Sequence, residues 1–112
     1  NDCLDFSFGK YYIKKVNALK CGDKGISVGE NSNLKIDETY VKESNTGVSS
    51  KDSSKVFVEN AKMKDIMSCL TSYKKKQEFW GGYIFTNKIE CSNFFKFFEK
   101  DDYSEIIIKN SI

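Results

Sequence analysis

The spacing of small residues along the chain constrains the fold more than any other feature of the sequence. Cysteine or glycine recurs at a constant interval, and an aliphatic residue follows in the first four cases; the positions are Cys3, Gly25, Gly47, Cys69 and Cys91. A repeat of constant length is typical of a solenoid, in which each unit stacks on the one before it. A coil of this length holds two or three short strands, which is the size expected for one turn of a β-helix.

Short segments with alternating apolar residues support the same repeat. Their inward candidates are Leu34 and Ile36, Val56 and Val58, Tyr83 and Phe85, and Ile106 and Ile108. Alternation of this kind has the period of a strand. Three of these segments are followed by Asn60, Asn87 and Asn110, which in a stacked turn would form an internal amide ladder.

We therefore predict an all-β fold, a right-handed parallel β-helix of about five coils of roughly 22 residues. A β-sandwich of short strands is the alternative, but hairpins in a sandwich have no reason to keep a constant phase. Residues 1–112 form one segment in this interpretation. Because the chain starts at Asn1, inside a repeat unit, we expect the segment to belong to a longer solenoid.

Two regions depart from the regular coil. The interval from Asn60 to Asn87 is longer than a regular coil by about five residues, which predicts a protruding loop at 73–83. Residues 92–112 are expected to form the last coil and a C-terminal cap. Four phenylalanines are expected to fill its interior, with a patch that docks a partner as the alternative; they are Phe94, Phe95, Phe97 and Phe98.

Composition excludes several classes of function. All 18 basic residues are lysine and the net charge is only +2, so nucleic-acid binding is not expected. No apolar run approaches the roughly 20 residues that cross a bilayer, so no membrane insertion is expected. The chain has no histidine, which removes the usual base of a serine hydrolase, and no cofactor or metal is expected.

The four cysteines allow two interpretations. On the constant phase, Cys69 and Cys91 lie about 4.8 Å apart on neighbouring coils, so a disulfide between them is geometrically possible. Buried free thiols that pack as small apolar groups are the preferred interpretation. A zinc site would need four scattered thiolates and is not expected.

Three segments resemble successive coils of the pectin-lyase-like superfamily. They begin at Asn1-Asp2-Cys3, Cys21-Gly22-Asp23 and Gly47-Val48-Ser49, and together they cover most of residues 1–69. They are similar to the β-helix repeat regions of secreted and surface proteins, some of which carry spore-coat-H-like kinase or lamin-tail modules. The resemblance implies the fold more strongly than any activity. An extracellular or cell-envelope location is a further expectation.

The acid and base residues of the polygalacturonases in that superfamily are only partly matched. Asp2 and Lys51 match family positions, whereas Asn1, Lys24 and Ser49 replace an aspartate, a histidine and an arginine. The amide of Asn1 cannot give the leaving sugar the proton that a carboxylic acid supplies. Catalysis by that mechanism is therefore not expected from this chain alone.

The remaining candidates point to polysaccharide as the partner. The aromatic rings of the loop at 73–83 offer flat apolar faces to sugar rings, and its lysines could pair with uronate or sulfate groups. A solvated loop folded onto the solenoid is the alternative. The predicted substrate-contacting residues are Asp2, Lys24, Lys51, Tyr73, Lys75 and Trp80.

Three functions follow as hypotheses. The first is a non-catalytic scaffold or carbohydrate-contacting surface of an extracellular or envelope protein. The second is part of a polysaccharide hydrolase or lyase whose site is completed by upstream residues. The third is an assembly module whose end coils pair with other chains.

Overall fold

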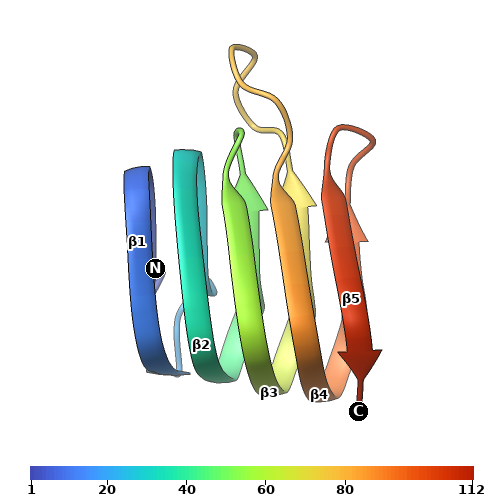
Figure 1. The fold of residues 1–112 in the computed structure, drawn as a ribbon. Helices are drawn as coiled ribbons and strands as arrows, with labels where there is room; N and C mark the ends of the chain where they lie inside the picture. The colour runs from blue at the N-terminus through green and yellow to red at the C-terminus, as the bar shows by residue number, and fades with distance from the viewer.

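The computed structural model describes residues 1–112 as five parallel strands stacked in chain order (Figure 1). The strands are β1 (Leu4–Leu19), β2 (Lys24–Lys51), β3 (Lys55–Tyr73), β4 (Tyr83–Lys100) and β5 (Glu105–Ser111). In Figure 1 the chain descends on the near side and climbs on the far side as it advances from β1 to β5, which is the right-handed sense. The predicted right-handed parallel β-helix is confirmed.

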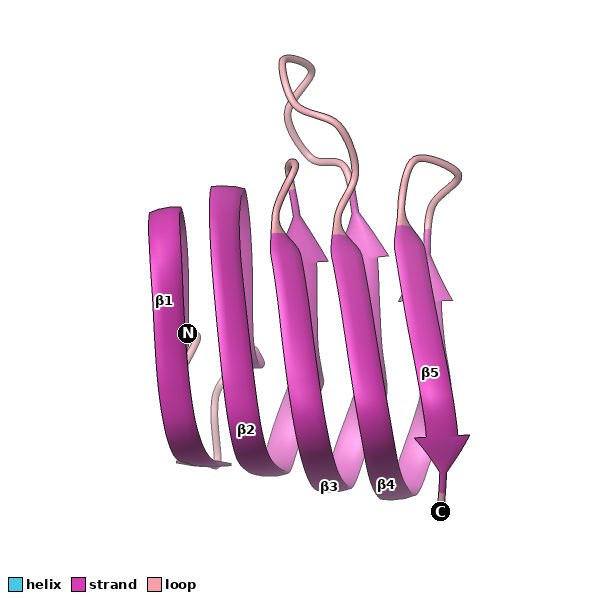
Figure 2. Ribbon diagram, in the orientation of Figure 1, coloured by secondary structure: helices cyan, strands magenta, loops and turns pink.

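The ribbons of β1 to β4 each continue around a corner, so each of these strands supplies two sides of a coil, while the short β5 is straight (Figure 2). Strand and loop are the only states that Figure 2 shows, and no helix is present that could span a membrane. The corner shared by β1 to β4 is made by residues with positive φ at matching positions: Lys20 (φ 55), Glu43 (φ 59), Asp65 (φ 61) and Asn93 (φ 52). Because this conformation bends the backbone sharply, the same turn recurs in each coil and keeps the coils in phase.

The register explains the repeat found in the sequence. Leu4 pairs with Ile26 and Val48 pairs with Leu70, so each partner lies one repeat further along the chain. Leu70 pairs with Phe98, six residues beyond the position that the repeat predicts. The six additional residues lie in the connection between β3 and β4, which projects from the edge of the solenoid in Figure 1.

Stacked aliphatic side chains fill the interior. Ile26, Val48 and Leu70 are fully buried and follow one another in neighbouring coils. Leu34, Val56 and Ile84 form a second such column. Burial of a side chain of this size contributes roughly 1.5–3 kcal/mol, and in a solenoid each coil can bury its residues only against its neighbours.

Three expectations about register past residue 73 are wrong, because the insertion has six residues, where the predictions allow for five or, in the case of Cys91, for none. The first concerns the inward residues of β4, which are Ile84 and Thr86, both fully buried, whereas Tyr83 and Phe85 point outward. A shift of one residue moves every side chain of a strand to its other face.

The insertion also removes two predicted stacks, of which the one between Cys69 and Cys91 keeps the regular spacing and allows for no inserted residues. Cys91 pairs with Met63, so it does not occupy the position equivalent to Cys69. Asn60 pairs with Lys88, and the Asn87 amide instead donates a hydrogen bond to Glu59 Oε1 at 2.6 Å. The Asn110 amide donates to the Asn87 backbone carbonyl at 3.2 Å, so one of the expected bonds from an asparagine to the neighbouring coil is present, but the three asparagines form no continuous ladder.

All four cysteines form disulfides, so the preference for free thiols is wrong. Cys3 is joined to Cys21, and Cys69 is joined to Cys91. The second bond is possible because Cys69 and Met63 both face the interior, and Cys91 stacks on Met63 in the next coil. The bond thus joins non-equivalent positions of neighbouring coils and encloses the whole connection between β3 and β4.

The phenylalanines near the C-terminus do not fill the interior as expected. Only Phe97 packs against the core, while Phe94, Phe95 and Phe98 are exposed. β5 pairs with β4 from Tyr83 to Ile89 and ends at Ser111, so residues 92–100 have no further coil stacked on them.

Candidate binding site at the loop edge

The connection from residue 74 to residue 82, called the edge loop below, is held at its start by two carboxylates from neighbouring coils. The backbone N–H of Lys74 donates to Asp101 Oδ2 at 2.7 Å. The N–H groups of Lys75 and Lys76 both donate to Asp52 Oδ1, at 2.7 and 2.9 Å. Three successive N–H groups thus bind carboxylate oxygens, and such charge-assisted hydrogen bonds are stronger than neutral ones.

Hydrogen bonds also determine the electrostatics of Asp101. Burial raises the pKa of this carboxyl, but hydrogen bonds from the Ser104 hydroxyl and from the N–H groups of Lys74 and Tyr103 outweigh that effect. The pKa of Asp101 is therefore lowered, and the group is a carboxylate at neutral pH. Its negative charge is part of the fixed support of the edge loop.

The returning limb of the edge loop passes very close to the solenoid backbone. The N–H of Trp80 donates to Ser53 Oγ at 2.8 Å, and the N–H of Ser53 donates to the Trp80 carbonyl at 3.1 Å. A Cβ on Gly81 would overlap the Tyr103 carbonyl oxygen, and one on Gly82 would overlap the Ser50 carbonyl oxygen, each at well under 3.0 Å. Only glycine fits at these two positions.

The tip of the edge loop reaches back over the first two coils. The Lys76 ammonium forms an ion pair with Glu30 Oε2 at 2.6 Å, and the Phe79 ring lies 6.4 Å from the Phe8 ring. The hydrogen bond between the two charged groups lowers the pKa of Glu30 and raises that of Lys76. Since the Lys76 side chain is exposed and that of Glu30 is only partly buried, this ion pair is weak compared with the anchoring of the loop base.

Trp80 and Tyr103 form an exposed aromatic pair beside the edge loop. Their ring centroids are 5.4 Å apart and their planes meet at 80°, an edge-to-face arrangement. The Lys74 ammonium lies 5.7 Å from the Trp80 ring centroid and 5.0 Å from that of Tyr103. Trp80 remains 65% exposed and Tyr103 49% exposed. Trp80 therefore does not fold down onto the solenoid.

A groove of about 570 Å³ runs beside this pair. Two lysines and two acidic residues also line it: Lys55, Lys100, Asp102 and Glu105. A volume of this size matches sites for small ligands, which combine apolar walls with a few polar groups.

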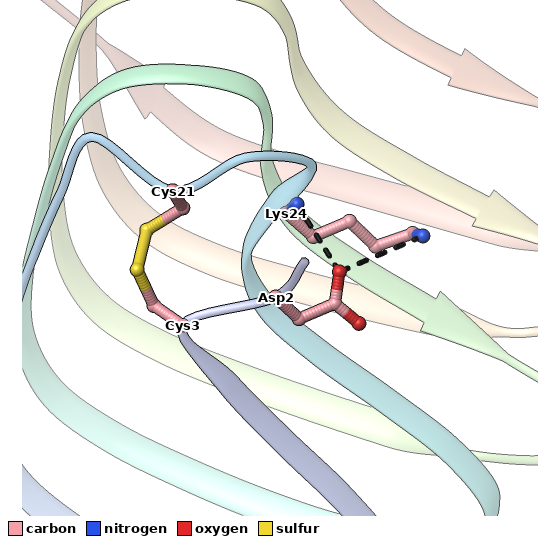
Figure 3. Close-up of a disulfide and its surroundings, with 4 residues drawn as sticks. All are labelled: Asp2, Cys3, Cys21 and Lys24. Atoms are coloured by element: carbon pink, nitrogen blue, oxygen red, sulfur yellow. Dashed lines mark hydrogen bonds and ion pairs between the residues drawn. A yellow bond between two sulfur atoms is a disulfide. The ribbon is translucent and has the colours of Figure 1, made fainter.

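The other sequence candidates lie on another outer face of the coils. Figure 3 shows Asp2 beside Lys24: the Lys24 N–H donates to Asp2 Oδ1 at 3.2 Å, and the ammonium lies 4.0 Å from the same oxygen. The ammonium also donates to Asp23 Oδ2 at 2.9 Å. Burial lowers the pKa of Lys24, but the effect of its acidic neighbours and of Tyr73 is larger and opposite. The pKa of Lys24 is therefore raised above its ordinary value.

Lys24 and Tyr73 line a shallow groove of about 450 Å³ on this face, together with Glu99 and Asp101. Lys51 pairs with Tyr73 in the register of β2 and β3. Ser49, at the position where the resemblance to polygalacturonases would place an arginine, is fully buried and cannot reach a ligand. No cluster of three or more metal-ligating side chains is present.

The six predicted contact residues thus divide into two groups. Asp2, Lys24, Lys51 and Tyr73 belong to the outer face, while Lys75 and Trp80 belong to the edge loop. Lys75 donates its backbone N–H to Asp52, which is its clearest role in the structure.

The predicted contact residues do not include Tyr103, which forms the aromatic pair with Trp80, or Lys74, whose ammonium lies over both rings. They also do not include Asp52 and Asp101, which hold the loop. A turn signal was available at Asp101-Asp102-Tyr103-Ser104, but its position beside Trp80 depends on the coil register.

The fold and the edge loop define a class: a right-handed parallel β-solenoid of five coils, stapled by two disulfides, with one long loop on its edge. Comparison with family models, with curated proteins and with solved structures gives no match to this chain. The class therefore rests on the geometry alone.

Proposed function

We propose that this chain is a non-catalytic solenoid segment that contacts carbohydrate at its loop edge. The observation that carries the proposal is the exposed Trp80–Tyr103 pair on a loop that the solenoid anchors at both ends. Aromatic rings combine a large apolar face with a polar edge, which suits the mixed surface of a sugar ring.

The edge loop is held in place by the solenoid, which favours a role in binding. The carboxylates of Asp52 and Asp101 bind the first three N–H groups of the loop, and Gly81 and Gly82 seat its end against backbone. A loop ordered in advance loses little conformational entropy when a ligand arrives. The charged groups along the groove can then form hydrogen bonds with hydroxyl, uronate or sulfate groups.

An extracellular or envelope location and membership of the pectin-lyase-like superfamily are parts of the same proposal. Two disulfides in 112 residues support an oxidising compartment, because cytosolic thiols are kept reduced. The right-handed parallel β-helix supports the superfamily, in which secreted and surface proteins are common.

The proposal is tested on an array of neutral and acidic polysaccharides that includes uronic acids. Wild type is compared with Trp80→Ala and with a matched control, Tyr12→Ala, which removes another exposed ring from the first coil. Loss of a central aromatic contact typically costs more than about 1 kcal/mol, or about fivefold in affinity. We expect that loss in Trp80→Ala only; equal binding by all three proteins would contradict the proposal.

The second candidate is a polysaccharide hydrolase or lyase whose site lies on the outer face. It is favoured by the meeting of Asp2 and Lys24 at that face, beside a groove with further carboxylates. Shortened polysaccharide products formed by wild type and lost in Lys51→Ala would support this candidate. Absence of products from every polysaccharide tested would count against it.

A further inference from the structure

The Trp80–Tyr103 pair already holds a cation in this structure. The two rings stand nearly perpendicular and form two walls, with the Lys74 ammonium 5.7 Å from one centroid and 5.0 Å from the other. Both distances are within the range of cation–π attraction. That attraction comes from the ring faces and does not depend on which molecule carries the charge. The two rings can therefore attract a cation that another molecule carries.

Lys74 is a weakly held occupant of this position. Its backbone is fixed by Asp101, whereas its ammonium belongs to none of the four ion pairs of the structure and to no hydrogen bond. A primary ammonium is strongly hydrated and lies on a flexible stem. It can move into water without disturbing the loop.

The groove beside the pair suits a larger ligand that carries a positive and a negative charge on separate groups. Asp102 and Glu105 line the same groove and are absent from the ion pairs, so their negative charges remain free to attract a cation. Lys55 and Lys100 line it as well and take part in no ion pair, so they can receive an anionic group. The groove has about 570 Å³, far more than one ammonium fills.

We propose that the Trp80–Tyr103 pair binds a quaternary ammonium group, and that the ligand displaces Lys74 to do so. A trimethylammonium group forms no hydrogen bonds to water and presents apolar methyl groups, so it gains more from aromatic walls than the ammonium it replaces. A neighbouring phosphate on the same ligand would meet Lys55 and Lys100. Phosphocholine combines these two charges, either in solution or as a lipid headgroup.

The test uses Trp80 fluorescence, because it is the single tryptophan of the chain. Wild type is titrated with choline chloride, with phosphocholine, and with ammonium chloride and sodium chloride at equal ionic strength. We expect saturable changes with the first two only. Phosphatidylcholine vesicles distinguish the sources: co-sedimentation of the protein indicates a headgroup, and its absence with a response to phosphocholine indicates a soluble ligand.

Three variants test the displacement itself. Lys74→Gln removes the resident cation, and we expect choline to bind about two- to fivefold more tightly. Lys14→Gln is the matched control, since it removes the same charge from an exposed lysine of β1 that contacts neither ring, and we expect no change. Tyr103→Ala removes one wall, and we expect the response to be lost.

The inference is overturned if neither wild type nor Lys74→Gln gives a saturable response, or if Lys74→Gln binds more weakly than wild type. It can fail independently of the carbohydrate proposal, because sugar binding that requires Trp80 can persist without any response to choline. If both hold, choline and sugar should compete for the same edge.

Discussion

Removal of the Cys69–Cys91 disulfide should destabilise the solenoid strongly. We consider the double variant Cys69→Ala/Cys91→Ala. The bond closes a segment with a sequence separation of 22 residues that contains the complete edge loop. Without it, the unfolded chain regains the entropy of opening that segment, which the loop-closure model places at about 3 kcal/mol.

The expected shift in melting temperature follows from the size of the chain. Unfolding entropy near 60 °C is about 2.1 cal/mol/K per residue, so a loss of about 3 kcal/mol corresponds to about 13 °C for a chain of this length. Removal of the buried sulfur atoms adds to the loss, because Cys69 is completely buried.

The measurement is thermal and urea unfolding followed by far-UV circular dichroism, at one protein concentration and without reductant. The control is Cys3→Ala/Cys21→Ala, whose segment is nearly as long, with a sequence separation of 18 residues, but lies in the first coil. There we expect faster hydrogen exchange confined to β1 and a smaller change in the main transition, since end coils open locally. A loss below about 1 kcal/mol in the first variant would refute the entropic argument.

Two further predictions concern the edge loop. Gly82→Ala places a methyl group against the Ser50 carbonyl oxygen, so we expect the free energy of unfolding in urea to fall by about 1–3 kcal/mol. Gly22→Ala is the control, since its nearest contact is 3.3 Å, and its stability should be almost unchanged. Equal effects of the two variants would contradict the predicted clash. Acidification should release the loop base, because folding lowers the pKa of Asp101. The stabilisation that the Asp101 carboxylate gives the folded state is complete above the ordinary aspartate pKa of about 3.9. It is lost as the pH falls through the lower pKa of the folded state. Trp80 fluorescence should report that transition in wild type, and its persistence in Asp101→Asn would show that another group is responsible.

The sequence was sufficient to predict the architecture up to the edge loop. The phase of Cys3, Gly25, Gly47 and Cys69 corresponds to the observed register, because inward positions of stacked coils must repeat at the coil length. The excess between Asn60 and Asn87 also indicated where the regular coil is interrupted. Its size was misjudged by one residue, and with a period of two that error reverses the faces of β4.

Cysteine pairing could not be read from the repeat. Equal spacing suggested that Cys69 and Cys91 stack, whereas they occupy different columns that approach each other in the interior. The distance across a coil depends on the corners, and no local pattern of residues gives it.

The sequence by itself determined that this chain coils and, up to the edge loop, what faces inward, because periodic burial is a local property that each repeat carries. Tertiary structure alone decided which residues meet at the edge. Lys74, Trp80 and Tyr103 come together from two coils, and Asp52 and Asp101 hold their loop from either side, through contacts between residues a full coil apart in the sequence. Such contacts depend on the exact register of the stack, so a candidate site that spans coils becomes visible only after the coils are in place.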